Sequence, residues 1–127
     1  MVLEDSLLES FPEESGEYKA IILRLDDKPA LLLGMNNKLH SYILKDFLKK
    51  NNVNYNYMSK KLSSGFIVHI PESKGSRYDV VCMGKLEINI REKTFRLKGN
   101  SHDYGLKINR EGIDIVKSLY PDWNVSL

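Results

Sequence analysis

The stretch "EYKAIILRLDDKPALLLGM", Glu17–Met35, decides the fold. Its first part, as far as Leu25, is rich in β-branched and large apolar residues and predicts a strand. The polar "DDKP" that follows is typical of a turn. "ALLLGM", Ala30–Met35, predicts a second strand. The whole stretch is therefore expected to form a β-hairpin.

A helix is predicted directly after this hairpin. "NNK", Asn36–Lys38, offers an N-cap, and the helix is expected to end near "KKNN" at residues 49–52. The apolar residues between them repeat at helical spacing. These residues are Leu39, Ile43, Leu44, Phe47 and Leu48.

The second half of the chain predicts more sheet and one more helix. "RYDVVCMGKLEINI", residues 77–90, is typical of a long strand with a bend or bulge at Gly84, and "TFRLKG" of its hairpin partner. "VNYNYM" and "GFIVHI", before them, predict short strands. A helix is expected from Arg110 to Leu119, with a last strand in "WNVSL". These elements predict one α+β domain with a mixed, mostly antiparallel sheet and two helices.

Length and composition limit the class of protein. A chain of 127 residues with 42% hydrophobic and 28% charged residues is typical of one globular domain. We expect residues 17–127 to form this domain and residues 1–16 to be a flexible acidic lead-in, with a helical turn at Leu7 and Leu8. The net charge of +2 is too balanced to indicate a nucleic-acid or membrane surface.

The location of the protein is also predicted from composition. The acidic start lacks the basic and apolar segments of a signal peptide, and no stretch is long enough to span a bilayer. Cys82 is the only cysteine, which excludes an internal disulfide and a cysteine metal site. A cytoplasmic protein is therefore expected.

His40 is the first candidate for chemistry. It falls in the first turn of the first predicted helix, just after the asparagine cap. Helix N-termini favour anions, and their dipole disfavours a charged imidazole, which would leave a neutral base beside a phosphate or carboxylate. The alternative is an ordinary surface histidine in a helical turn.

Lys19 is the second candidate. It has the same strand parity as Ile21 and Leu23, so if that face is buried the lysine must bring its ammonium out at the sheet edge. An ammonium in that position can pair with a bound phosphate. The alternative is a lysine that only places its charge in solvent.

The loop "GNSHDYG", Gly99–Gly105, is the third candidate. Its two glycines allow the backbone to fold into an anion-binding nest, and Ser101 adds a hydroxyl donor. Glycine-rich loops are common, so an ordinary polar loop is the alternative. His102 and Asp103 are adjacent and usually point in different directions, so the pattern predicts no metal site.

Three further features favour structural roles. His69 lies in an apolar run and is expected to be a hydrogen-bonded core or edge residue. Cys82 has apolar neighbours and is expected to be buried and inert. The tyrosines and lysines of residues 55–61 match an aromatic and basic pattern for RNA, but a solvated strand face is favoured, and no nucleic-acid partner is expected.

Taken in order, these segments resemble the small phosphohistidine phosphatases of the Janus family. The matching pieces are "YKAIILRL", "LHSYILKDF", "VVCMGKLEINIREKTFRLKG", "GNSHDYG" and a helix that runs into "YPDWNV". The last two are the most specific, because family members end a strand in Gly-x-Ser-x-x-aromatic-Gly and close the next helix with Tyr-Pro-Asp-aromatic. The resemblance covers most of Glu17–Val125.

The resemblance implies a role for each matching residue. The catalytic histidine of the family begins its first helix and falls on His40. The phosphate-binding lysine of its first strand falls on Lys19. Its phosphate loop uses a serine and the two residues after it, partly through backbone N–H groups, which fall on Ser101, His102 and Asp103.

The chain also departs from the family pattern. Asp103 replaces a small residue, and a carboxylate repels a phosphate beside it. Asn100 stands where an aromatic residue is common, and Leu33 where some members have arginine. Val53–Gly75 is expected to be an insertion.

The function that the resemblance implies is hydrolysis of the P–N bond of phosphorylated histidine, without a metal or another cofactor. His40 would act either as general base or as nucleophile. The expected partners are phosphohistidine-containing proteins, and a monomer is expected. The alternative is a non-catalytic module of the same fold that binds phosphate or phosphopeptides.

Overall fold

The computed structural model describes residues 14–127. The helical turn predicted at Leu7 and Leu8, with most of the lead-in, lies outside the described residues. Within the described range the chain is a single α+β domain with two helices and a mixed, mostly antiparallel sheet, as predicted. No helix in this range has the length and apolar character needed to cross a membrane.

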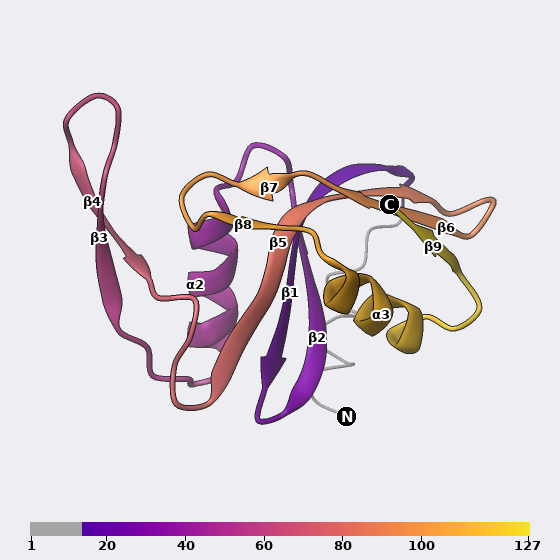
Figure 1. Ribbon diagram of the computed structural model, residues 1–127, viewed down its shortest axis with the longest axis horizontal. Helices are drawn as coiled ribbons and strands as arrows, with labels where there is room; N and C mark the ends of the chain where they lie inside the picture. The colour runs from indigo at the N-terminus through magenta and orange to yellow at the C-terminus, as the bar shows by residue number, and fades with distance from the viewer. Residues whose placement is uncertain (1–13) are drawn as a thin grey trace.

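The main sheet has five strands in the order β2-β1-β5-β6-β9 (Figure 1). Neighbouring strands in this sheet run antiparallel, except that β6 and β9 are parallel. The hairpin predicted over Glu17–Met35 is present, and Asp26 and Asp27, with φ of 51° and 65°, form its two-residue turn. The strands are β1 (Gly16–Leu25), β2 (Lys28–Gly34), β5 (Tyr78–Asn89), β6 (Thr94–Lys98) and β9 (Asn124–Ser126).

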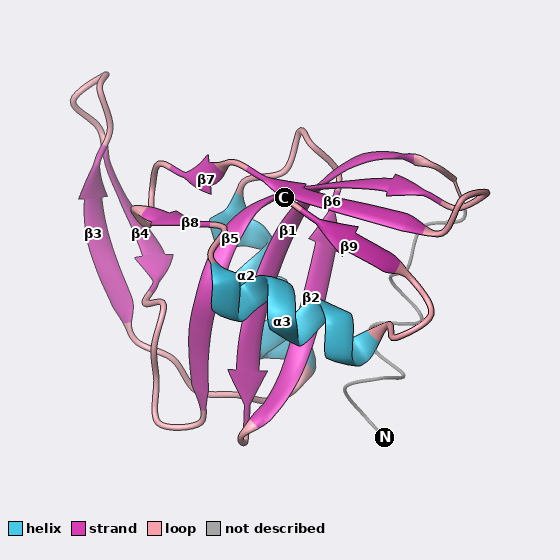
Figure 2. Cartoon of the chain, turned by 45° about the vertical axis from the view of Figure 1, so that its right-hand side comes forward, coloured by secondary structure: helices cyan, strands magenta, loops and turns pink. Residues whose placement is uncertain are grey.

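Strand β1 is buried on both sides because a helix covers each face of the sheet (Figure 2). On one face α2 (His40–Lys50) lies so close to Gly34 that a Cβ there would be 2.5 Å from the Ile43 side chain. On the other face α3 (Arg110–Leu119) places Gly112 against Cys82. Residues 20–23 are fully buried as a result, which explains their continuous apolar sequence.

The bulge in β5 lies at Val81, opposite the register shift between Ile22 and Leu23 of β1, and not at Gly84 as predicted. The Val81 carbonyl accepts a hydrogen bond from Asn109 Nδ2 at 3.1 Å, and Asn109 Oδ1 accepts one from the Gly112 N–H at 2.8 Å. Asn109 therefore caps α3 and ties it to the bulge. Gly84 serves close packing instead, because a Cβ there would lie 2.5 Å from the Lys98 carbonyl oxygen.

A separate hairpin, β3 (Tyr57–Lys61) and β4 (Ile67–Pro71), stands beside α2 at one end of the molecule (Figure 1). It occupies the segment expected to be an insertion. The strand predicted from Val53 begins later, at Tyr57, because Val53 closes α2: its N–H donates to the Leu48 carbonyl at 2.8 Å and its side chain is buried.

The remaining strands are short. β7 (Asn100–Ser101) and β8 (Leu106–Lys107) pair with each other and hold the loop between them. Both lie in contact with β5. They place the predicted phosphate loop beside the sheet, near the first turn of α2 (Figure 1).

The double role of Asn109 can be tested by substitution. Asn109→Ala should lower the free energy of unfolding by about 1–2 kcal/mol, because it removes the helix cap and the partner of the Val81 carbonyl. Asn109→Asp retains the capping oxygen and should lose less. Urea unfolding of the three proteins measures both effects, and an Asn109→Ala protein as stable as the wild type would contradict the assignment.

Candidate active site

An open cleft of about 710 Å³ lies between the first turn of α2, the sheet and the loop that follows β6. The structure brings all five predicted site residues to its walls. These residues are Lys19, His40, Ser101, His102 and Asp103. Three separate segments of the chain therefore meet at one polar cleft.

Three lysines form a row across strands β1, β5 and β6 beside this cleft. The register pairs Lys19 of β1 with Lys85 of β5, and Lys85 with Lys98 of β6. Directly paired residues point to the same face of a sheet, and neighbouring strands lie about 4.8 Å apart. Like charges in such positions destabilise a sheet, so this row requires negative charge nearby.

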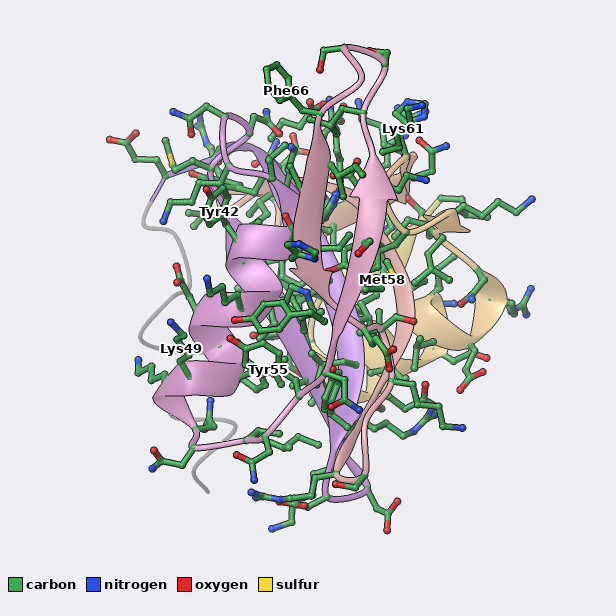
Figure 3. The ribbon with its side chains drawn as sticks, turned by 90° about the vertical axis from the view of Figure 1, so that its left-hand side faces the viewer. Tyr42, Lys49, Tyr55, Met58, Lys61 and Phe66 are labelled. Atoms are coloured by element: carbon green, nitrogen blue, oxygen red, sulfur yellow. The ribbon has the colours of Figure 1, made fainter. Side chains whose placement is uncertain are left out.

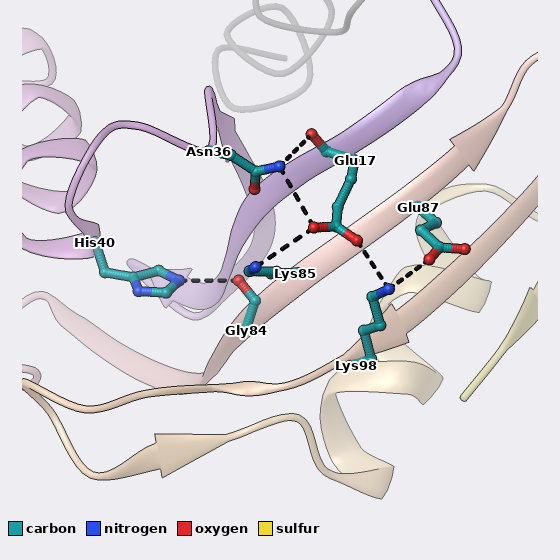
Figure 4. Close-up of polar contacts among 7 residues, drawn as sticks. All are labelled: Glu17, Asn36, His40, Gly84, Lys85, Glu87 and Lys98. Atoms are coloured by element: carbon teal, nitrogen blue, oxygen red, sulfur yellow. Dashed lines mark hydrogen bonds and ion pairs between the residues drawn. The ribbon is translucent and has the colours of Figure 1, made fainter.

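Two of these lysines obtain negative charge from the protein. Lys98 Nζ lies 2.8 Å from Glu17 Oε2 and also contacts Glu87, and Lys85 Nζ lies 3.4 Å from Glu17 Oε1 (Figure 4). The hydrogen bond from Lys98 lowers the pKa of Glu17, and the two carboxylates raise the pKa of Lys98. Glu17 and Glu87 thus hold Lys85 and Lys98 in place.

Lys19 is different, because it forms no ion pair with any residue in the described range. Its ammonium comes out of the buried face, as predicted, but into the open cleft and not at a lateral edge of the sheet, because β1 lies between β2 and β5. The Lys19 side chain enters the cleft because α2 begins at His40 and covers only the part of this sheet face beyond that residue. Lys19 is therefore available to an anion in the cleft.

His40 is the first residue of α2, and its ring reaches the backbone of β5 (Figure 4). Its Nε2 lies 2.9 Å from the Gly84 carbonyl oxygen. A carbonyl only accepts, so Nε2 carries the hydrogen and Nδ1 of the neutral ring has the free lone pair. The side chain is 6% exposed, so the alternative of an ordinary surface histidine is wrong.

The pKa of His40 lies below its ordinary value of 6.5. Burial is the main cause, and the nearby charges of Lys19 and Lys85 act in the same direction. The bond to Gly84 and the Asp103 carboxylate oppose the shift. The result is an imidazole that is neutral at pH 7 and able to accept a proton at Nδ1.

The predicted asparagine cap of α2 is not formed. Leu39 occupies the N-cap position and makes no side-chain capping bond. Asn36 instead donates from Nδ2 to the Glu17 carbonyl at 3.1 Å, which ties the segment before α2 to β1 (Figure 4). The amide therefore helps to shape the cleft rather than the helix end.

The loop after β6 is closed by backbone hydrogen bonds. The Gly105 N–H donates to the Ser101 carbonyl at 2.9 Å, and the Ile108 N–H donates to the Gly99 carbonyl at 3.1 Å. Gly99 and Gly105 have φ of +81° and +64°, the left-handed region that favours glycine. The two glycines thus allow the chain to turn back tightly at both ends of the loop.

The residues between these glycines differ in exposure. Ser101 is buried at the wall of the cleft, His102 is exposed and Asp103 is half-buried. The Tyr104 hydroxyl donates to the Pro71 carbonyl at 2.7 Å and so fixes the loop to the base of the β3–β4 hairpin. Backbone N–H groups of such a loop are suited to an anion, whereas the Asp103 carboxylate opposes one.

The other residues that the sequence singled out lie elsewhere. His69 is exposed on β4, where Nδ1 lies 3.2 Å from the Ser59 hydroxyl. Cys82 is fully buried under α3, as predicted. The tyrosines and lysines of residues 55–61 belong to β3 and the segment before it.

Sequence reasoning missed Lys85 and Lys98, which also line the cleft. A signal existed in the sequence. Lys85 lies between Gly84 and Leu86, and Lys98 lies between Leu97 and Gly99, so each lysine alternates with glycine or leucine along its strand. That pattern marks an open face of a strand. Only the register shows that these lysines lie beside Lys19.

Comparison with known proteins does not assign the chain to a family. No protein-family model matches the chain, and no curated protein matches it significantly. The residues and their geometry therefore carry the functional argument.

The protonation state of His40 is directly measurable. Its pKa should lie below 6.5, and its neutral form should be the Nε2–H tautomer that donates to Gly84. Long-range ¹H–¹⁵N correlation spectra recorded across a pH titration report both. A neutral ring protonated at Nδ1 would contradict the assignment.

The same shift predicts how stability depends on pH. Because the pKa of His40 is lower in the folded than in the unfolded state, its contribution is present above about pH 6.5 and is lost as the pH falls through the folded pKa. Between about pH 7.5 and 5.5 the wild type should therefore lose more free energy of unfolding than His40→Gln. Equal losses by both proteins in urea unfolding would contradict this.

Proposed function

We propose that this chain is a metal-independent phosphohistidine phosphatase, which hydrolyses the P–N bond of phosphorylated histidine in cytoplasmic proteins. One observation carries the proposal: the His40 imidazole, whose Nε2 bonds to Gly84, shares a cleft with a glycine-flanked loop and with the Lys19 ammonium, which forms no ion pair within residues 14–127. These are the groups that transfer of a phosphoryl group to water requires.

The phosphoryl oxygens would be bound by three kinds of donor. Lys19 supplies a full positive charge, Ser101 supplies a hydroxyl, and the backbone N–H groups of His102 and Asp103 complete the cradle. Phosphoryl transfer depends mainly on positioning and on neutralising these oxygens. The pairing of Lys85 and Lys98 with carboxylates directs the phosphate towards Lys19.

His40 acts on the attacking water. As the water oxygen bonds to phosphorus, Nδ1 takes one of its protons, the P–N bond breaks, and the leaving imidazole nitrogen takes a proton from solvent. The imidazolium then returns its proton to solvent. The Gly84 carbonyl keeps the ring oriented throughout and stabilises its positive charge.

His40 as a nucleophile is the second route to the same reaction. Nδ1 would bond to phosphorus as the substrate P–N bond breaks, and water would then release phosphate from His40. Rapid quenching in alkali distinguishes the routes, because phosphohistidine survives in base. A phosphorylated His40 that forms and decays within one turnover supports the nucleophile, and its absence supports the general base.

A non-catalytic phosphopeptide-binding module is the second candidate function. The observation behind it is Asp103, a half-buried carboxylate at the wall of the cleft where the family that the chain resembles has a small residue. Its charge weakens phosphate binding in either function, so it favours the module only because the loop departs from the catalytic pattern. In that case the cleft would bind the phosphorylated chain without turning it over.

Two substitutions separate the roles of the cleft residues. His40→Ala should lower kcat for a phosphoramidate by a factor of about 10²–10⁴, the contribution of a general base. Lys19→Ala should mainly raise KM and leave some turnover at saturation. Lys117→Ala, an exposed lysine on α3, is the matched control and should retain full activity.

The assay measures phosphate release in the presence of a chelator, alongside a thermal melt of each protein. His40→Ala should also be less stable by about 1–3 kcal/mol, since it leaves the Gly84 carbonyl without its partner. Full activity in folded His40→Ala would refute the catalytic role. A wild type that binds phosphopeptides but releases no phosphate would establish the binding module instead.

A further inference from the structure

Six of the eight exposed large hydrophobic side chains among residues 14–127 lie at the start of α2 or on the β3–β4 hairpin. Figure 3 views this part of the surface, where the β3–β4 hairpin stands next to α2 and the Phe66 ring lies on the α2 side of the hairpin tip. The six are Leu39 and Tyr42 at the start of α2, and Tyr57, Leu62, Phe66 and Ile67 of the hairpin.

A groove of about 160 Å³ runs between α2 and the hairpin, and we call it the hairpin groove. Tyr42 and Lys45 line it from α2, and Leu62, Val68 and Ile70 line it from the hairpin. Most of its lining side chains are apolar, and the charged groups in the lining are the Lys45 ammonium and the Asp103 carboxylate. A free phosphate or a phosphorylated imidazole alone would make no use of such walls.

The hairpin groove continues into the candidate cleft. Leu39 and Asp103 line both. The bond from the Tyr104 hydroxyl to the Pro71 carbonyl holds the phosphate loop against the hairpin, so the two sites keep a fixed relation. A polypeptide whose phosphoryl group lies near Lys19 can therefore leave the cleft across Asp103 and enter the groove.

The helix and the hairpin that form the hairpin groove carry more positive than negative charge, while the Asp103 carboxylate lines the groove at its end next to the candidate cleft. Residues 40–50 and 57–71 carry five lysines against one aspartate. Lys45 lies in the groove itself, and Lys60 and Lys61 lie on β3. Lys45 in the groove and the lysines on its two flanking elements attract acidic side chains and repel basic ones.

We propose that the hairpin groove binds the segment of the substrate protein next to the phosphorylated histidine, and that it selects segments with apolar and acidic side chains. The proposal rests on the proposed function, since it names the substrate of that site. Apolar side chains buried against Tyr42 and the hairpin supply affinity, and the lysines supply charge complementarity. The phosphate cleft alone would not discriminate between flanking sequences.

Two short peptides with a central, non-hydrolysable phosphohistidine analogue test this directly. One carries leucine and glutamate beside the analogue, and the other carries serine and glutamine. Fluorescence anisotropy should show that the wild type binds the leucine and glutamate peptide about tenfold more tightly, or better. The double substitution Tyr42→Ser with Phe66→Ser should abolish this preference.

Tyr42 and Phe66 are 58% and 73% exposed, so their substitution leaves the core intact. The matched control is Leu127→Ser, which removes a side chain that is 68% exposed at the C-terminus, away from the groove (Figure 1), and should retain the preference. Lys19→Ala should weaken both peptides by the same factor.

Equal affinity of the wild type for both peptides would overturn the proposal, as would a preference that survives the double substitution. It would also be overturned if sedimentation showed a wild-type dimer that the substitution dissociates, or if single-stranded RNA displaced the peptide from the groove. Peptide preference without hydrolysis of phosphohistidine would refute the phosphatase and leave the groove standing. Hydrolysis without preference would refute only the groove.

Discussion

The cross-strand row of Lys19, Lys85 and Lys98 is the constraint on which the site depends. The sheet presents this row where neither helix covers it, and three like charges in register need negative partners. Glu17 and Glu87 provide them for two lysines and leave Lys19 to the cleft. The charges of Lys19 and Lys85 also lower the pKa of His40, which favours the neutral imidazole that the proposed function needs.

The fold and the proposed chemistry meet in the bond between His40 and Gly84. It fixes the first turn of α2 to β5, and it selects the nitrogen that faces the reaction. Burial of the ring makes this arrangement both a packing contact and a source of a lowered pKa. A single position therefore links the stability of the domain to the proton that the proposed mechanism would move.

Local patterns were enough to predict much of this structure. The apolar run in Glu17–Met35 predicted the hairpin, and the spacing from Leu39 onwards predicted α2. The glycines of residues 99–105 predicted a loop with unusual backbone angles, and both have positive φ because this property is local. The predicted site residues do converge, although their function stays a prediction.

The errors and omissions come from long-range contacts. Lys85 and Lys98 join the site only through strand register, and Val81 rather than Gly84 carries the bulge because β1 and Asn109 lie against it. Asn36 serves Glu17 instead of capping α2. A crystal structure with orthovanadate tests the central claim most directly: we predict vanadate within about 2.7–3.2 Å of Lys19 Nζ and the Ser101 hydroxyl, with His40 Nδ1 facing it. Vanadate bound outside this cleft, or with Nδ1 turned away, would contradict the account.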